Sequence, residues 1–162
     1  MDYRTARPQI TSGDIIAFTH SGWGSWADIE SQIVRIATRS EYSHVGVTWV
    51  TGGRVFILEA VVPEIRIFPL RKLVPFYWVP MYSPLSRPTE RYALSRVGQE
   101  YSKWEAVKGF FGSTRLDQKW QCAEYVRMVL SVNKSMAPGK NTPTAIVQDA
   151  LKQGRTLHWV DR

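Results

Sequence analysis

Cys122 is the only cysteine among the 162 residues, which excludes an internal disulfide and any thiolate-rich zinc site. A lone thiol serves either packing or chemistry. A cysteine that acts as a nucleophile needs a base within hydrogen-bonding reach. The base in turn needs a third group that orients it and stabilises its cation. The predicted positions of His44 and Glu59 suit these two tasks.

A β-hairpin is predicted from two β-rich runs, residues 44–50 and 55–61, on either side of Thr51-Gly52-Gly53-Arg54. If the Gly pair forms a two-residue loop, Gly46 lies opposite Glu59. Opposed residues point to the same side of a sheet and side chains alternate along each strand, so one face is shared by His44, Gly46, Glu59 and Val61. A loop of another length would reverse this parity. We expect open space over Gly46 between the imidazole and the carboxylate. The alternative interpretation is an edge-facing glutamate and a hydrogen-bonded histidine with no catalytic role.

A helix is predicted to carry the cysteine. Asp117 is a candidate cap, and apolar residues follow at helical spacing at Cys122, Tyr125, Val126, Val129 and Leu130. Cys122 would fall in the first turn or two, where free backbone N–H groups and the helix dipole favour a thiolate and can stabilise an oxyanion. Because Cys122 lies on the apolar stripe, burial in the core is the alternative interpretation.

The other elements complete an α+β protein, in which an antiparallel β-sheet packs against helices. Further strands are predicted over residues 14–18, 64–70, 76–82 and 156–160. Further helices are predicted over residues 25–39, 88–97, 102–111 and 143–153. No repeat or flexible linker divides the chain, so we expect one domain covering residues 1–162.

Composition limits the function classes. The chain has neither a signal-peptide pattern nor the roughly 20 uninterrupted apolar residues of a membrane-spanning helix, so we expect a cytoplasmic protein. The net charge of +7, most of it in residues 81–162, favours contact with an anionic polymer or membrane surface, although a solvated basic face is the commoner meaning. No metal site or cofactor is expected, because ligand spacing is absent from His20, His44 and His158. The sequence does not indicate an oligomeric state.

Six short motifs follow one another along nearly the whole chain: Gly13-Asp14-Ile15-Ile16, residues 38–47, Leu58-Glu59-Ala60, Gly98-Gln99-Glu100-Tyr101, Cys122-Ala123-Glu124 and Thr142-Pro143. Together they resemble the permuted papain-like cysteine hydrolases of the NlpC superfamily, in particular its YiiX-like branch. The order is distinctive, because unpermuted relatives carry the cysteine before the histidine. The resemblance implies a circularly permuted papain-like fold.

The resemblance also implies a mechanism, with Cys122 as nucleophile, His44 as base and Glu59 as the orienting group. The implied reaction is acyl transfer through a thioester, on peptide amides, including those of cell walls, or on lipid esters and amides. Three positions depart from the family pattern and bear on the substrate pocket: Ser102, Ala123 and Gln121. Residues that would line that pocket are Tyr101, Trp120 and Gln121, which are equally plausible as helix-packing residues.

Three other functions stay open. A lipid-directed acyltransferase or thioesterase would use the basic half of the chain at an anionic membrane. A nucleic-acid-binding module would use the basic and aromatic residues between Lys103 and Trp120, although no specific nucleic-acid motif is present. A degenerate hydrolase would serve as a structural protein. For the location, the distribution of the family gives association with a phage or virion as the alternative to the cytoplasm.

Overall fold

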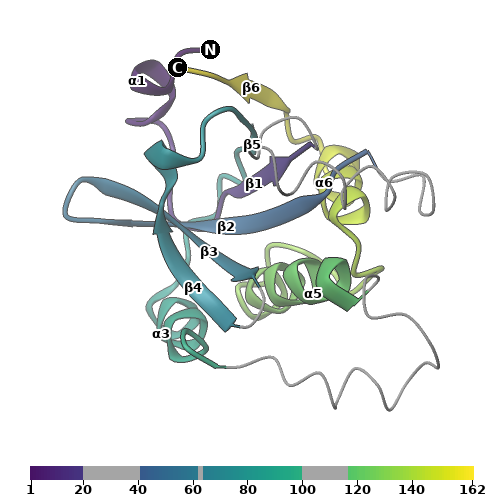
Figure 1. Ribbon diagram of the computed structural model, residues 1–162. Helices are drawn as coiled ribbons and strands as arrows, with labels where there is room; N and C mark the ends of the chain where they lie inside the picture. Colours follow the sequence, from purple (N-terminus) through teal and green to yellow (C-terminus); the bar gives the residue numbers. More distant parts are fainter. Residues whose placement is uncertain (20–40, 62–63, 100–116) are drawn as a thin grey trace.

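The computed structural model describes residues 1–19, 41–61, 64–99 and 117–162, of which residues 117–121 are described by their backbone alone (Figure 1). In these segments an antiparallel sheet has six strands in the order β4-β3-β2-β1-β5-β6. The strands are β1 (Ile15–Phe18), β2 (His44–Thr51), β3 (Arg54–Val61), β4 (Glu64–Pro69), β5 (Phe76–Val79) and β6 (His158–Val160). The predicted α+β class is therefore confirmed.

Three of the described helices pack on one face of this sheet: α3 (Arg87–Ser95), α5 (Asp117–Val132) and α6 (Pro143–Lys152). The helix starts follow from the sequence. Ser86 caps α3 by accepting a hydrogen bond from the N–H of Thr89 at 3.3 Å, and Thr142 caps α6 by accepting one from Ala145 at 3.2 Å. The short helix α1 (Tyr3–Ala6) and the 3-10 helix η2 (Leu70–Lys72) contribute to a smaller apolar cluster on the opposite face.

The β2–β3 hairpin has the predicted register. Thr51 pairs with Arg54 and Val47 with Leu58, and the two-residue turn is made by Gly52 and Gly53. Both glycines have positive φ, +53° and +70°, which the tight hairpin turn requires. The register that the parity argument assumed is therefore confirmed from the Val47–Leu58 pair to the Thr51–Arg54 pair.

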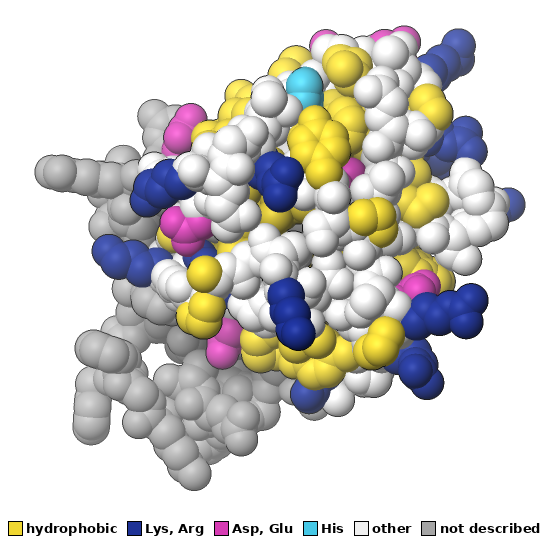
Figure 2. Space-filling model, turned by 180° about the vertical axis from the view of Figure 1, so that it is seen from behind, with side chains coloured by type: hydrophobic (Ala, Val, Ile, Leu, Met, Phe, Trp, Pro, Cys, Tyr) yellow, Lys and Arg dark blue, Asp and Glu magenta, His cyan; other side chains and the backbone are white. Residues whose placement is uncertain are grey.

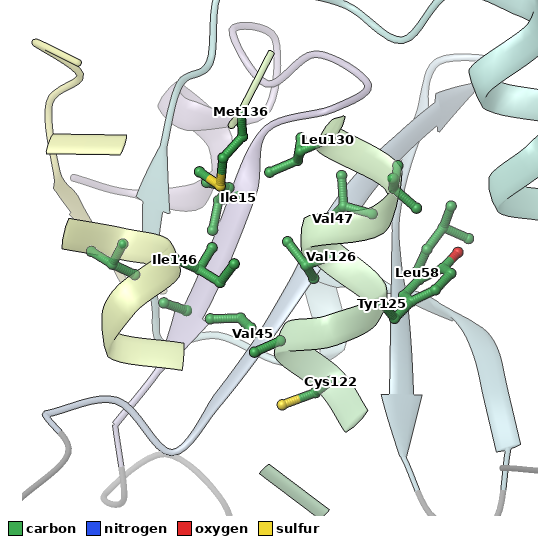
Figure 3. Close-up of a cluster of buried hydrophobic side chains, with 14 of the residues drawn as sticks. Ile15, Val45, Val47, Leu58, Cys122, Tyr125, Val126, Leu130, Met136 and Ile146 are labelled. Atoms are coloured by element: carbon green, nitrogen blue, oxygen red, sulfur yellow. The ribbon is translucent and has the colours of Figure 1, made fainter. Parts of the chain in front are cut away.

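Alternation along the strands separates the two apolar clusters. Figure 3 shows the larger cluster, in which Val126 and Leu130 of α5 pack with Ile15, Val45 and Val47 of the sheet. The apolar stripe predicted for α5 is confirmed, because all five of its members are fully buried: Cys122, Tyr125, Val126, Val129 and Leu130. Helix α5 packs against β2 and β3, the two strands that carry His44 and Glu59.

Asp14 fixes β1 against β5. Its carboxylate is 1% exposed and accepts hydrogen bonds from the backbone N–H of Thr11 and Met81 and from the indole N–H of Trp78, each at 2.9 Å. The Thr11 hydroxyl donates a fourth bond at 3.2 Å. A buried carboxylate is stable only with such partners. The Gly13-Asp14 motif therefore has a structural role, which is to hold the central strand.

Some elements differ from the predictions. Strand β5 ends at Val79 rather than residue 82, because Pro80 follows and has no N–H for the ladder. Strand β6 is shorter than predicted, and α1 and η2 were not predicted. The helices predicted over residues 25–39 and 102–111 lie outside the described residues. Among the described helices, none has the length and apolar character needed to cross a membrane.

The first residues lie beside the last strand. The Met1 amine donates to the carbonyl of Trp159 at 2.9 Å, and the N–H of Tyr3 donates to the carbonyl of Asp161 at 2.9 Å. The N–H of Asp161 donates back to the carbonyl of Met1 at 3.0 Å. Figure 1 shows the two ends of the chain close together above α1.

Candidate active site

His44 and Glu59 are hydrogen-bonded. His44 is the first residue of β2, and its Nε2 lies 2.7 Å from Oε2 of Glu59 in β3. The prediction of open space over Gly46 is wrong, however. A Cβ at Gly46 would lie 2.5 Å from both Cγ1 and Cδ1 of Ile57, so the Ile57 side chain occupies that space. Gly46 is needed for this close packing, and the imidazole and carboxylate meet beside it.

Glu59 is held between two cationic groups. Its side chain is 0% exposed, and its second oxygen, Oε1, accepts a hydrogen bond from Nε of Arg66 at 2.9 Å and lies 2.8 Å from Nη2 of the same guanidinium in an ion pair. Burial raises the pKa of Glu59, but hydrogen bonds and charges from His44 and Arg66 outweigh it, so the pKa is lowered overall. Glu59 is therefore an ionised carboxylate at neutral pH.

Arg66 is a site residue that the sequence reasoning missed. It lies directly opposite Glu59 in the β3–β4 pair, and its guanidinium also stacks on the ring of Phe68, 4.8 Å from the centroid. The parity argument used for β2 and β3 finds Arg66 only once the pairing of β4 with β3 is known. Pairing of Val61 with Glu64 places residue 66 opposite residue 59 in the same way.

Cys122 completes a row of contacts. Its side chain is fully buried and forms a hydrogen bond with His44. The contacts therefore run from Cys122 to His44, from His44 to Glu59, and from Glu59 to Arg66. The structure brings the three predicted triad residues together from β2, β3 and α5, although they lie far apart in the sequence.

The helix start contributes less to this site than the sequence reasoning assumed. Helix α5 begins at Asp117, which makes Cys122 its sixth residue. Only the first four N–H groups of a helix lack an internal partner, and the dipole effect fades beyond the first turn. The N–H of Cys122 is therefore outside the unpaired set. The contact with His44, rather than the start of α5, therefore links this thiol to the site.

The electrostatic environment favours a protonated His44. Burial lowers the pKa of His44, but the charge of Cys122 and a hydrogen bond with it, together with the hydrogen bond and charge of Glu59, raise it from 6.5 to about 10. The imidazole side chain remains 16% exposed. A cation between a sulfur and a carboxylate is the arrangement that a cysteine nucleophile and its base adopt before reaction.

The raised pKa of His44 predicts an unusual titration. Because the folded value of about 10 lies above the unfolded value of 6.5, the His44 proton stabilises the fold fully below pH 6.5, and this contribution is lost as the pH rises through about 10. We expect carbon-13 NMR of labelled histidine to give a midpoint well above 6.5. In Cys122→Ala the midpoint should fall toward 6.5, because the largest raising influence is removed. Met128→Ala, a change to another sulfur side chain on α5, should leave it in place. An equal midpoint in Cys122→Ala and the unmodified protein would contradict the contact.

The predicted pocket residues cannot be placed. Tyr101 lies outside the described residues. Trp120 and Gln121 belong to the first turns of α5, and only their backbone is described. In the described part of the chain, no group of three or more His, Cys, Asp or Glu side chains could hold a metal ion.

Comparison with known proteins rests on the fold. No family model matches the sequence, and no curated protein matches it. Among solved structures, the crystal structure of the metalloprotein YiiX from Escherichia coli O157:H7 matches with a TM-score of 0.55 and 22% identity, over 79% of this chain and 68% of that chain. The fold is YiiX-like.

A YiiX-like fold confirms the predicted architecture, an antiparallel sheet with helices packed against it. At 22% identity the likeness concerns the fold alone. The description of YiiX as a metalloprotein applies to that protein. In this chain Cys122, His44 and Glu59 follow one another in a row and do not form a cluster suited to a metal.

Proposed function

We propose that this chain is a cysteine hydrolase that cleaves an amide or ester through a thioester on Cys122. The row of contacts from Cys122 through His44 to Glu59 is the observation that carries the proposal. A fully buried ionised carboxylate beside an imidazole is expensive unless it is paired, and here it is paired with the residue that contacts the only thiol in the chain. The YiiX-like fold is compatible with a permuted papain-like hydrolase.

The proposed mechanism assigns one task to each group. Before reaction the thiol proton has already passed to His44, in agreement with the raised pKa of its imidazole, and the Cys122 sulfur attacks the carbonyl carbon. The resulting imidazolium gives its proton to the leaving amine or alcohol as the tetrahedral intermediate collapses to a thioester. Water, deprotonated by His44, then releases the acid and restores the thiol. Glu59 holds the imidazole orientation and stabilises its cation, and Arg66 holds the carboxylate.

The substrate class in this proposal is an acyl donor with a peptide amide, such as a cell-wall peptide, or a lipid ester. A basic groove for nucleic acid gains no support from the face shown in Figure 2. There the Lys and Arg side chains are spread apart, with acidic, polar and apolar side chains between them. Such a distribution is typical of a solvated basic surface.

Trapping of the acyl-enzyme tests the proposal. The protein is incubated with a panel of acyl electrophiles built on wall peptides, isopeptides and lipid esters, and intact mass spectrometry measures adducts. We expect at least one class to add a single acyl group, and peptide mapping to place it on Cys122. Cys122→Ala should show no adduct, whereas Met128→Ala should react as the unmodified protein does. Folded protein that forms no adduct with any member of the panel would contradict the proposal.

A further inference from the structure

A cavity lies outside the row of site residues. It has a volume of about 310 Å³ and is lined from three segments: α1 with Arg7, the start of β3, and the end of β4 with η2. Its apolar lining comes from Val55, Phe56 and Pro69. Val55 lies four residues before Glu59 on β3, a separation of about 13 Å along an extended strand. The cavity is therefore distinct from the candidate active site.

Three arginines face this cavity without a counter-charge. Arg7, Arg54 and Arg71 all line it, and all three are exposed. No carboxylate lines the cavity, and none of the three arginines forms an ion pair with any described residue. Like charges that gather around one hollow repel one another unless an anion lies between them. An anionic ligand in the cavity would therefore relieve the repulsion between these arginines.

One hydrogen bond holds Arg7 beside the cavity, and Arg7 and Arg71 both act electrostatically on Tyr3. The guanidinium of Arg7 donates a hydrogen bond to the carbonyl of Gly53, which fixes it beside the β2–β3 turn. Tyr3, the remaining lining residue, lies within the field of Arg7 and Arg71: burial raises the pKa of its hydroxyl, and the two positive charges lower it in part. Arg7 and Arg71 therefore approach the same phenol from two different elements.

The ligand class follows from charge, geometry and volume. A phosphate ester carries a charge of about −1.5 to −2 at neutral pH, which suits three cations better than a single carboxylate does. The planar guanidinium fork matches phosphate oxygens. The volume of about 310 Å³ lies in the range of small-molecule sites and leaves room beyond one phosphate group. Phe56 and Val55 supply an apolar surface for the rest of the molecule.

We propose that this cavity binds an organic phosphate ester, with the phosphate on Arg7, Arg54 and Arg71 and the organic part against Phe56. Two kinds of ligand carry this group: a soluble phosphate ester and a phospholipid headgroup. The site does not depend on the proposed hydrolase function, because none of its lining residues belongs to the row from Cys122 to Arg66.

Binding of three probes tests the inference: inorganic phosphate, phenyl phosphate, and phosphatidylcholine vesicles with or without phosphatidic acid. Nitrogen-15 NMR follows the soluble probes, and vesicle co-sedimentation follows the lipid. We expect phenyl phosphate to bind more tightly than inorganic phosphate, with shifts confined to the cavity residues. Arg54→Gln and Arg71→Gln should each weaken binding about tenfold, the effect of losing one charge-assisted hydrogen bond.

Arg91→Gln is the matched control, because it removes the same charge from an exposed position on α3. Binding to phosphatidic acid vesicles alone, lost in Arg54→Gln, would identify a lipid headgroup as the source and support the site. The inference is overturned if Arg91→Gln weakens binding as much as Arg54→Gln, or if inorganic phosphate binds as tightly as phenyl phosphate. Absence of binding by all three probes overturns it as well. The binding measurements are repeated in Cys122→Ala, which lacks the proposed nucleophile and keeps every cavity residue. Phosphate binding is then tested independently of the acyl-enzyme experiment.

Discussion

The His44→Ala variant is expected to lose about 10²- to 10⁴-fold in turnover, the usual contribution of a general base. It should also slow the alkylation of Cys122 by iodoacetamide near neutral pH. His44 is the side chain that contacts both the thiol and the buried carboxylate, so its removal separates Cys122 from Glu59. Alkylation followed by mass spectrometry measures thiol reactivity even before a substrate is known.

Two controls separate chemistry from folding in this experiment. The His44 ring lies 5.8 Å from that of Phe18, so His44→Ala also removes a packing contact, and His44→Gln restores most of that volume. His158→Ala makes the same chemical change in the last strand. We expect His44→Gln to be as unreactive as His44→Ala, and His158→Ala to be as reactive as the unmodified protein. Rapid alkylation of Cys122 in a folded His44→Gln protein would contradict the proposed base.

The largest loss of stability is expected for Asp14→Ala, about 3–5 kcal/mol. The Asp14 carboxylate accepts four hydrogen bonds, and its removal leaves the Trp78 indole N–H and the Met81 N–H without their acceptor inside the protein. Each unsatisfied buried donor costs about 1–3 kcal/mol. A loss of this size is a large share of the 5–15 kcal/mol that is usual for a domain.

Urea unfolding measures this loss. Asp161→Ala is the matched control, because Asp161 is exposed and its contacts with Met1 and Tyr3 are made by the backbone. The control should change the free energy of unfolding by less than about 0.5 kcal/mol, as for most surface substitutions. A similarly small change in Asp14→Ala would show that water or a shifted neighbour replaces the carboxylate, and would remove Asp14 as the anchor of β1.

Local patterns were sufficient to predict the part of the site that depends on one hairpin and one helix. The Gly52-Gly53 turn sets the register of β2 and β3, and the register sets which side chains share a face. The apolar spacing of α5 predicts which of its sides is buried. The meeting of Cys122 with His44 is a long-range contact, and it was expected through the family resemblance rather than through any local pattern.

Other features depend on neighbours that no local pattern reveals. Helix α1 has four residues, too few for a periodic signal, and it ends where Ala6 packs into the smaller apolar cluster. The filling of the space over Gly46 depends on the side-chain conformation of Ile57 across the strand pair. Arg66 looks like an ordinary strand cation until the position of β4 beside β3 is known. The sequence also left undetermined the residue at which α5 begins, and therefore how far Cys122 lies from the start of the helix.

Backbone hydrogen bonds between residues 1–3 and 159–161 mean that the connectivity of the chain and the geometry of the candidate site are separable in this molecule. A short peptide bridge across these segments, with new ends opened between β5 and α3, would leave every strand pair and the Cys122–His44–Glu59 row in place. In such a rewired chain the cysteine would be synthesised ahead of the histidine. The order of the three residues along the chain therefore depends only on where the circularised chain is opened, and the proposed chemistry requires neither order.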